Sequence, residues 1–207
     1  MNELERRLAR PPEMGLDGER LRAQLAVRAA ADGLLDVAYA TLDSPMGELL
    51  VAVTRRGLVR VAYPHEGWDP VLADLADRIS PRVLAAPERT DATRRALEAY
   101  FAGHLRAFDL PIDWALVHGF ATGVLQATAR VPFGSVTTYK KVAAQAGSPR
   151  ASRAAGNALG SNPIPIVVPC HRVVHADGTL GGYTGGLDRK EFLLRLEGVD
   201  PASPAPA

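Results

Sequence analysis

The sequence predicts an α+β protein, with a short antiparallel sheet in the first half of the chain and a group of helices in the second. Two observations predict this arrangement. Between residues 36 and 63, apolar side chains recur at every second position and tight turns interrupt them, which is typical of a strand meander. Between residues 119 and 160, apolar side chains recur at helical spacing instead. The chain has 207 residues, enough for one compact domain or two small ones.

Three strands are expected in the first half, over residues 37–42, 49–53 and 58–63. The turn sequences Ser-Pro-Met-Gly at 44–47 and Arg-Arg-Gly at 55–57 separate them. Proline and glycine favour such turns because proline presets φ and glycine accepts a positive φ. Consecutive strands joined by so few residues pair antiparallel.

Helices are predicted where apolar residues return every three or four positions. Thr137 or Thr138 is expected to cap a short helix that runs through Ala146. Gly147 separates it from the next helix, and the pair has the outline of a helix-turn-helix. Many pairs of short helices share this outline, so it does not establish DNA binding by itself. The predicted helices cover residues 18–31, 70–79, 91–103, 119–130, 138–146, 150–160 and 188–197.

Basic residues are concentrated in the second half of the chain. Residues 114–176 contain six Lys and Arg residues and no Asp or Glu, although the chain has 23 acidic residues and a net charge of +1. A segment of this kind is suited to bind a polyanion. A neutral core segment with a few solvated cations would have the same composition. The predicted helix-turn-helix lies inside the segment and favours nucleic acid as the partner.

The composition excludes several classes of protein. Hydrophobic residues at 47% and charged residues at 23% exclude a wholly disordered or collagen-like chain, and no apolar run is long enough for a membrane span. No secretory signal is visible, and Glu3, Glu5 and Glu13 argue against a transit peptide. Cys170 is the one cysteine, so neither an internal disulfide nor a cysteine-rich zinc site is expected. We therefore expect a cytoplasmic protein with no metal and no cofactor.

Cys170 and His171 form the one place where the sequence indicates nucleophile chemistry. A thiol attacks well as a thiolate, which requires a neighbour that accepts its proton. Three prolines between residues 162 and 174 predict a stiff, extended strip. Adjacent side chains of an extended strip point to opposite faces, so a bridging water or a local twist would link the thiol and the imidazole. The alternative is an inert buried thiol beside a structural histidine.

A histidine that acts as a base usually has a carboxylate at its other ring nitrogen. Glu197 lies in the last turn of the predicted C-terminal helix and can point inward if residues 192–196 face the core. Spacing alone leaves the choice open among the five carboxylates that follow the Cys-His pair, namely Asp177, Asp188, Glu191, Glu197 and Asp200.

The run Pro-Cys-His-Arg-Val at 169–173, preceded by Asn-Pro-Ile-Pro-Ile at 162–166, resembles the signature of the O6-alkylguanine-DNA alkyltransferases. These proteins are also called methylated-DNA–protein-cysteine methyltransferases. One departure is Leu125, which stands where the family commonly has tryptophan and leaves volume for the core to fill. The resemblance covers about residues 36–198, and its further motifs are Val-Pro-x-Gly-x-Val-x-x-Tyr at 131–139, Ala-x-Arg-Ala-x-Gly at 151–156, Gly-Gly-Tyr-x-Gly-Gly at 181–186, Arg-Lys at 189–190 and Leu-Glu-Gly at 196–198.

The resemblance implies two domains, a ribonuclease H-like N-terminal domain and a helical C-terminal domain that carries the helix-turn-helix. The first would span residues 36–115, and the second, which would hold the active site and bind DNA, residues 116–198. Residues 1–35 would be an N-terminal extension, partly helical or disordered, and residues 199–207 a disordered tail rich in Pro and Ala.

The resemblance also implies catalytic roles. Cys170 would be the alkyl acceptor, His171 the base that acts through water, and Glu197 the carboxylate that orients it. Asn162 would be the hinge that ties the recognition helix to the active-site strip, and Tyr139 would contact the guanine and help to rotate the nucleotide.

Other residues would contact DNA or the extruded base. Arg153 resembles the arginine finger that fills the gap in the duplex. The Val173 carbonyl and the Thr184 amide would read the base. The full DNA-binding set is Arg153, Tyr139, Thr138, Ala154, Gly156 and Asn157, and the full pocket set is Val173, Tyr183, Thr184, Pro165 and Lys190.

The function implied is the irreversible transfer of an alkyl group from O6-alkylguanine in double-stranded DNA to Cys170, with O4-alkylthymine as a second candidate substrate. The expected protein is a monomer that binds the minor groove through the helix-turn-helix and repairs one lesion. Three alternatives stay open: a non-catalytic lesion binder with this fold, a dimeric helix-turn-helix regulator with an incidental cysteine, and a thiol hydrolase that uses Cys170 and His171.

Overall fold

The computed structural model describes residues 21, 24, 28–29 and 33–202 of the chain. The predicted N-terminal extension lies mostly outside these residues, as does much of the predicted tail. Of the helix expected over 18–31, the four described residues, Leu21, Gln24, Arg28 and Ala29, are helical.

The first half contains a four-stranded sheet with the strand order β3-β2-β1-β4. The antiparallel meander predicted from the sequence is present as β1 (Val37–Leu42), β2 (Leu49–Thr54) and β3 (Gly57–Ala62). The fourth strand, β4 (Val83–Ala85), pairs parallel with β1 and was not predicted. A strand of three residues is too short to show a period-two pattern, so only its partner reveals it.

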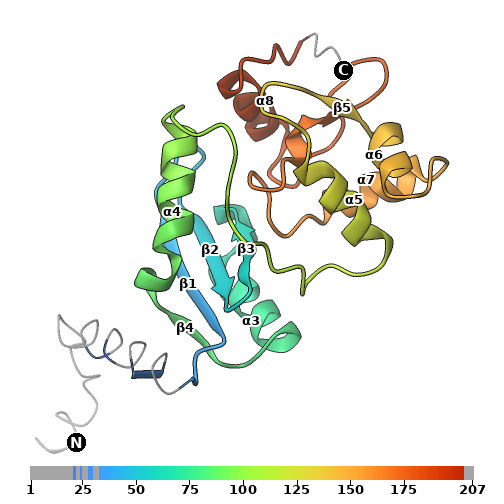
Figure 1. The fold of residues 1–207 in the computed structure, drawn as a ribbon. Helices are drawn as coiled ribbons and strands as arrows, with labels where there is room; N and C mark the ends of the chain where they lie inside the picture. The colour runs from blue at the N-terminus through green and yellow to red at the C-terminus, as the bar shows by residue number, and fades with distance from the viewer. Residues whose placement is uncertain (1–20, 22–23, 25–27, 30–32, 203–207) are drawn as a thin grey trace, which may run out of the picture.

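Helices cover both faces of this sheet (Figure 1). Helix α4 (Pro87–Phe101) packs with one set of alternate strand residues, which includes Leu49 and Val51, and α3 (Trp68–Arg78) packs with the other, which includes Leu50 and Ala52. Burial on both faces explains why β2 is an almost continuous apolar run. A 3-10 turn, η1 (Pro64–Glu66), connects β3 to α3.

The second half contains four helices and a two-stranded parallel ladder (Figure 1). Thr138 caps α6, because its hydroxyl accepts a hydrogen bond from the Lys141 amide at 3.2 Å. A short turn joins α6 to α7 at the place where the sequence predicts a helix-turn-helix. The elements are α5 (Phe120–Ala129), β5 (Thr137–Thr138), α6 (Tyr139–Gln145), α7 (Ser152–Gly160), η2 (Cys170–Arg172), β6 (Val173–Val174) and α8 (Leu187–Leu196).

The prediction of an extended strip over residues 162–174 is wrong. Most of the segment folds into turns, Cys170 begins the 3-10 helix η2, and only β6 is extended. Backbone bonds within the segment explain the difference, since the Val168 amide donates to the Ile164 carbonyl at 2.9 Å. The prolines do prevent ladder pairing, but the freed backbone turns rather than extends.

The two halves share one hydrophobic core. Leu97 and Tyr100 of α4 belong to the same buried cluster as Val124 of α5 and Leu193 of α8. Leu125, which replaces the usual tryptophan of the resembled family, is 1% exposed within this cluster. No helix in the described part of the chain combines the length and the apolar composition that a membrane crossing requires.

Candidate active site

Cys170 lies at the start of η2 and is 4% exposed. Asn162 holds the turn that leads to it. The Asn162 side-chain amide donates to the Val168 carbonyl at 2.9 Å and to the Cys170 sulfur at 3.1 Å, and its oxygen accepts from the Ile164 amide at 3.0 Å. One asparagine, two residues after the end of α7, therefore fixes both the backbone of the active-site segment and the direction of the thiol.

Ile166, in the same segment, has a strained backbone conformation. Its φ is +74°, and it is the one non-glycine residue with a positive φ in the described chain. This conformation costs of order 1–3 kcal/mol for a branched side chain. Ile166 is fully buried, and tight packing around it is what sustains the conformation. The segment before Cys170 is thus held by its surroundings rather than by its own preference.

His171 and Glu197 form a buried pair. His171 Nε2 lies 2.9 Å from Glu197 Oε1, and both side chains are 0% exposed. Burial lowers the pKa of His171, so the imidazole is neutral at pH 7. We assign Nε2 as the donor because it faces an ionised carboxylate. The acceptor nitrogen is then Nδ1, which is buried and has no protein partner among the described residues.

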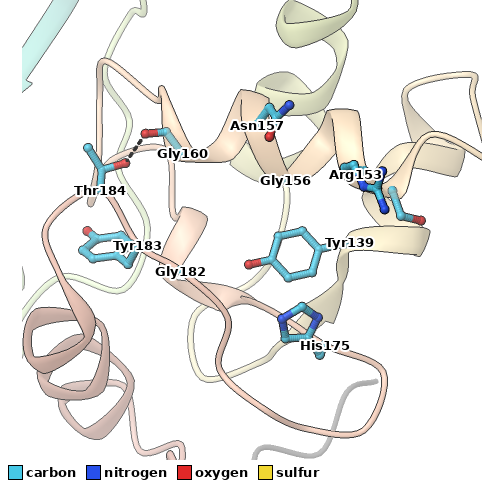
Figure 2. Close-up of a pocket in the computed structure, with 10 residues that line it drawn as sticks. Tyr139, Arg153, Gly156, Asn157, Gly160, His175, Gly182, Tyr183 and Thr184 are labelled. Atoms are coloured by element: carbon cyan, nitrogen blue, oxygen red, sulfur yellow. Dashed lines mark hydrogen bonds between the residues drawn. The ribbon is translucent and has the colours of Figure 1, made fainter.

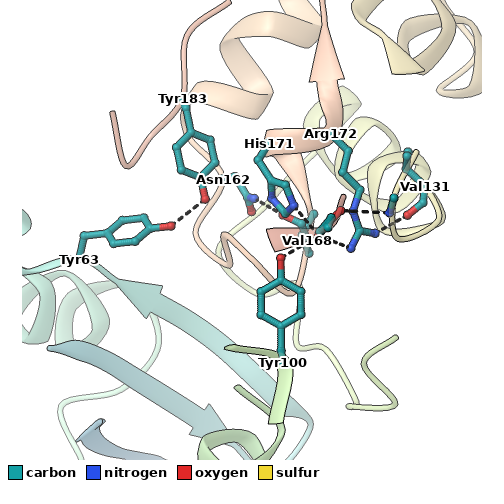
Figure 3. Close-up of polar contacts among 10 residues, drawn as sticks. Tyr63, Tyr100, Val131, Asn162, Val168, His171, Arg172 and Tyr183 are labelled. Carbon is teal, nitrogen blue, oxygen red and sulfur yellow. Dashed lines mark hydrogen bonds and ion pairs between the residues drawn. The ribbon is translucent and has the colours of Figure 1, made fainter. Parts of the chain in front are cut away.

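Glu197 accepts hydrogen bonds from several other donors, of which Figure 3 labels Arg172 and Tyr100. Arg172 binds both carboxylate oxygens, through Nε and Nη2 at 2.8 Å each, and Tyr100 donates its hydroxyl to Oε1 at 2.7 Å. The Gly134 amide donates to Oε2 at 3.3 Å. Burial by itself would raise the pKa of Glu197, but the hydrogen bonds from His171 and Arg172 lower it to about 2. The carboxylate is therefore ionised at neutral pH.

The Cys170 thiol is protonated in this resting arrangement. Burial raises its pKa to about 11, and the Asn162 hydrogen bond and the charge of Lys190 offset only part of that rise. Lys190 is itself 0% exposed and donates to the Val173 carbonyl at 2.7 Å and to the Leu180 carbonyl. Burial lowers the pKa of Lys190 to about 8. A proton acceptor is thus required before the thiol can attack.

A cavity of about 640 Å³ opens beside this centre (Figure 2). Tyr139 and Arg153 both line it, and the centroids of the Tyr139 and His175 rings lie 5.0 Å apart. Burial raises the pKa of Tyr139, so its hydroxyl keeps its proton. The lining residues are Tyr139, Ser152, Arg153, Gly156, Asn157, Gly160, His175, Gly182, Tyr183 and Thr184.

The structure does not bring every predicted site residue to this cavity. Thr138 is 8% exposed and caps α6, and Pro165 is buried within the turns that lead to Cys170. Val173 and Lys190 are also buried, where they bond to each other. Ala154 is exposed on α7 but does not line the cavity. Cys170, His171, Glu197 and Asn162 form the buried centre described above.

The acid-free segment 114–176 is mainly a surface feature. Five of its six cations are exposed, namely Arg130, Lys140, Lys141, Arg150 and Arg153. Arg172 is the exception, because it is buried against Glu197. The exposed set favours the polyanion interpretation over the neutral-core alternative.

Sequence reasoning missed several residues around the site. Arg172 was counted as a surface cation, and Tyr63 and Tyr100 come from the first half of the chain, where no motif points to them. His175 lines the cavity four residues after His171, without a spacing that would reveal it. Among the described residues, no group of three or more His, Cys, Asp or Glu side chains is placed to hold a metal ion.

Comparison with known proteins identifies the family. The family model for the 6-O-methylguanine DNA methyltransferase ribonuclease-like domain matches residues 37–114, and the model for the DNA-binding domain of the same family matches residues 119–199. The chain is 41% identical to a methylated-DNA–protein-cysteine methyltransferase of Methanosarcina acetivorans over 77% of this chain and 97% of the relative. It is 36% identical to the protein of that name from Rattus norvegicus, over 81% and 85% of the two chains.

Solved structures agree with this assignment. The O6-methylguanine methyltransferase of Mycobacterium tuberculosis has a TM-score of 0.66 at 38% identity, covering 78% of this chain and 92% of that one. The same bacterium's protein has also been solved in complex with DNA, with a TM-score of 0.66 at 37% identity over 81% and 96% of the chains. With both family models matched and the fold shared, the chain belongs to the 6-O-methylguanine DNA methyltransferase family.

Proposed function

We propose that this protein repairs DNA by transferring the alkyl group of O6-alkylguanine in duplex DNA irreversibly to Cys170. The observation that carries the proposal is the geometry of the buried centre. Asn162 directs the thiol at 3.1 Å, and the His171–Glu197 pair lies next to it with an imidazole nitrogen free to accept a proton. The family relationship supports the same chemistry, because the relatives named above are methylated-DNA–protein-cysteine methyltransferases.

The first step is deprotonation of the thiol. The Cys170 proton passes through a water molecule to His171 Nδ1, and the resulting imidazolium is stabilised by Glu197 at 2.9 Å. The raised pKa of Cys170 makes this step necessary, and the lowered pKa of His171 keeps its lone pair available. Arg172 and Tyr100 hold the carboxylate in place.

The second step is displacement at the alkyl carbon. A bond forms between Cys170 sulfur and the alkyl carbon while the carbon–O6 bond breaks, and the electron pair stays on the purine. The Tyr139 hydroxyl or a backbone amide donates a hydrogen bond that stabilises the negative charge on the leaving guanine, which then takes up a proton from water. The product is a thioether, and none of the site residues can expel the alkyl group. Each molecule therefore acts once.

The base must leave the stacked duplex to reach Cys170, which costs a few kcal/mol. In our proposal α6 and α7 approach the minor groove, Arg153 fills the gap, and Tyr139 helps to rotate the nucleotide. The exposed cations of segment 114–176 bind phosphates and make binding sensitive to salt. All site residues come from one chain, so a monomer suffices.

The test is the intact mass of the protein after mixing with excess duplex that carries O6-methylguanine. We expect a gain of one methyl group on Cys170, and no gain for Cys170→Ser. A protein that binds the lesion duplex tightly but gains no mass would be a damage-recognition protein. Absence of both transfer and lesion preference would refute the repair function, and operator binding or acyl turnover would then favour the regulator or the hydrolase.

A further inference from the structure

Tyr63 reaches the active site from the sheet of the first half. It follows β3 directly and is 0% exposed, and it shares a hydrogen bond of 2.7 Å with the hydroxyl of Tyr183, 120 residues away in the sequence (Figure 3). The two rings meet edge to face with 6.3 Å between centroids. Neither the helix pair nor the Cys-His motif requires this contact, so it needs its own explanation.

The Tyr183 side chain separates the cavity from the catalytic centre. It lines the 640 Å³ cavity, and its ring packs edge-on against His171 with 6.3 Å between centroids and an interplanar angle of 89°. A base that enters the cavity and presents its alkyl group to Cys170 must therefore pass Tyr183. The position of this ring sets the room that the alkyl group has.

Contacts with Tyr63 and Gly185 restrain the Tyr183 ring from moving toward Tyr63. A β-carbon at Gly185 would lie 2.8 Å from ring atoms of both Tyr63 and Tyr183, so the loop is packed tightly between the two rings. The Arg189 guanidinium lies 5.1 Å from the Tyr63 ring centroid, and it donates to the Gly185 carbonyl at 2.9 Å and to the Met46 carbonyl at 3.2 Å. Tyr63, Tyr183, Gly185 and Arg189 form a packed group that we call the Tyr63–Tyr183 cluster.

We infer that Tyr63 is a specificity-determining residue that limits the size of the alkyl group. The inference rests on the proposed function. A methyl group needs no movement of Tyr183, whereas a bulky group must push the ring toward Tyr63. That movement would break the hydrogen bond between the hydroxyls of the half-buried Tyr183 and the fully buried Tyr63 and would compress a packed loop, both of which are unfavourable. Discrimination between small and bulky alkyl groups therefore depends on a residue of the first half of the chain, which the substrate does not touch and which restrains Tyr183.

The experiment compares two lesions in one duplex sequence, O6-methylguanine and O6-benzylguanine, and measures single-turnover transfer to Cys170 by intact mass. Tyr63→Leu removes the hydroxyl and leaves space behind Tyr183. We expect it to raise the benzyl-to-methyl rate ratio roughly tenfold, within the range that one contact in an apolar pocket supplies. Tyr63→Phe, which keeps the ring and removes the hydroxyl, should raise the ratio by a smaller factor.

Tyr39→Leu is the matched control, because Tyr39 packs in the hydrophobic cluster on the α3 side of the sheet, away from the Tyr63–Tyr183 cluster. Its ratio should equal that of the unmodified protein. General loss of stability lowers both rates together and leaves the ratio unchanged, so a ratio unchanged or reduced in both Tyr63 variants would overturn the inference. If Tyr63→Leu does not fold, the Tyr63→Phe ratio decides. Failure of the unmodified protein to accept methyl would instead overturn the proposed function.

Discussion

The buried centre around Cys170, His171 and Glu197 and the cavity that we propose faces DNA lie side by side but are built in opposite ways. Around Glu197 the polar side chains are buried, and five hydrogen bonds converge on one carboxylate. Around Arg153 the helical surface is exposed and carries cations with no acidic neighbour in the segment. Proton transfer needs groups held at fixed distances, whereas a surface for DNA must be solvated before binding. Substitutions in the centre should therefore affect folding, and substitutions at the cavity should affect binding.

Glu197→Gln should have the largest effect on folding. The substitution leaves Arg172 buried without its ionic partner, and loss of one member of a buried pair costs about 3–5 kcal/mol of unfolding free energy. Transfer should slow by a factor of about 10²–10⁴, the usual contribution of general acid–base catalysis. Urea unfolding and single-turnover transfer measure the two effects.

Glu191→Gln is the control for this substitution. Glu191 lies on the same helix, α8, and pairs with Arg195 at 2.8 Å on an exposed surface. Such surface pairs contribute about 0–1 kcal/mol. Equal losses of stability in the two variants would show that burial of the Glu197 network has no special role.

Lowering the pH should also reduce the free energy of unfolding, because it protonates Glu197. Glu197 has a pKa of about 2 in the folded protein, whereas its ordinary value is 4.5. Between these values the unfolded chain binds a proton that the folded protein does not, so the free energy of unfolding falls as the pH falls from about 5 to 2. The difference corresponds to about 3 kcal/mol. Because pH 3 is still above the folded-state pKa of about 2, unfolding at pH 7 and pH 3 should differ by about 2 kcal/mol of this amount, and Glu197→Gln should show a smaller difference.

Tyr100→Phe tests the contribution of the first half to the catalytic centre. The variant keeps the ring and removes a buried hydroxyl that donates to Glu197 at 2.7 Å. Hydrogen bonds to charged groups contribute about 1.5–3 kcal/mol, so we expect a loss of about 2 kcal/mol in unfolding free energy. Transfer should also slow, because the carboxylate loses one of its restraints. Tyr39→Phe, which lies outside the network, should change neither quantity; an equal loss there would contradict the assigned role.

The difference between the two regions also explains how much the sequence could predict. The helices and the meander depend on local patterns, and Thr138 caps α6 as its position suggests. The pairing of β4 with β1 joins distant segments and left no such pattern, so β4 was not predicted. The turns before Cys170 depend on backbone bonds within that segment, which its prolines do not reveal. The choice of Glu197 among five carboxylates depended on a family resemblance, because spacing does not show which way α8 turns. Arg172 shows the same limit, since composition cannot distinguish a buried cation from a solvated one.

Arg153→Ala should have the smallest effect on folding and is the sharpest test of the comparison. Arg153 is exposed on α7, and exposed substitutions commonly change stability by less than about 0.5 kcal/mol. The free energy of binding to the lesion duplex should weaken by about 1–3 kcal/mol. If Arg153 also neutralises a phosphate, the plot of the logarithm of the binding constant against the logarithm of the salt concentration should become less steep by about one unit of slope. Arg95→Ala, an exposed change on α4 in the other half, should leave both binding and stability unaltered. A large loss of stability in Arg153→Ala with unchanged binding would mean that the DNA-facing surface is built like the catalytic centre, and the contrast between the two regions would not hold.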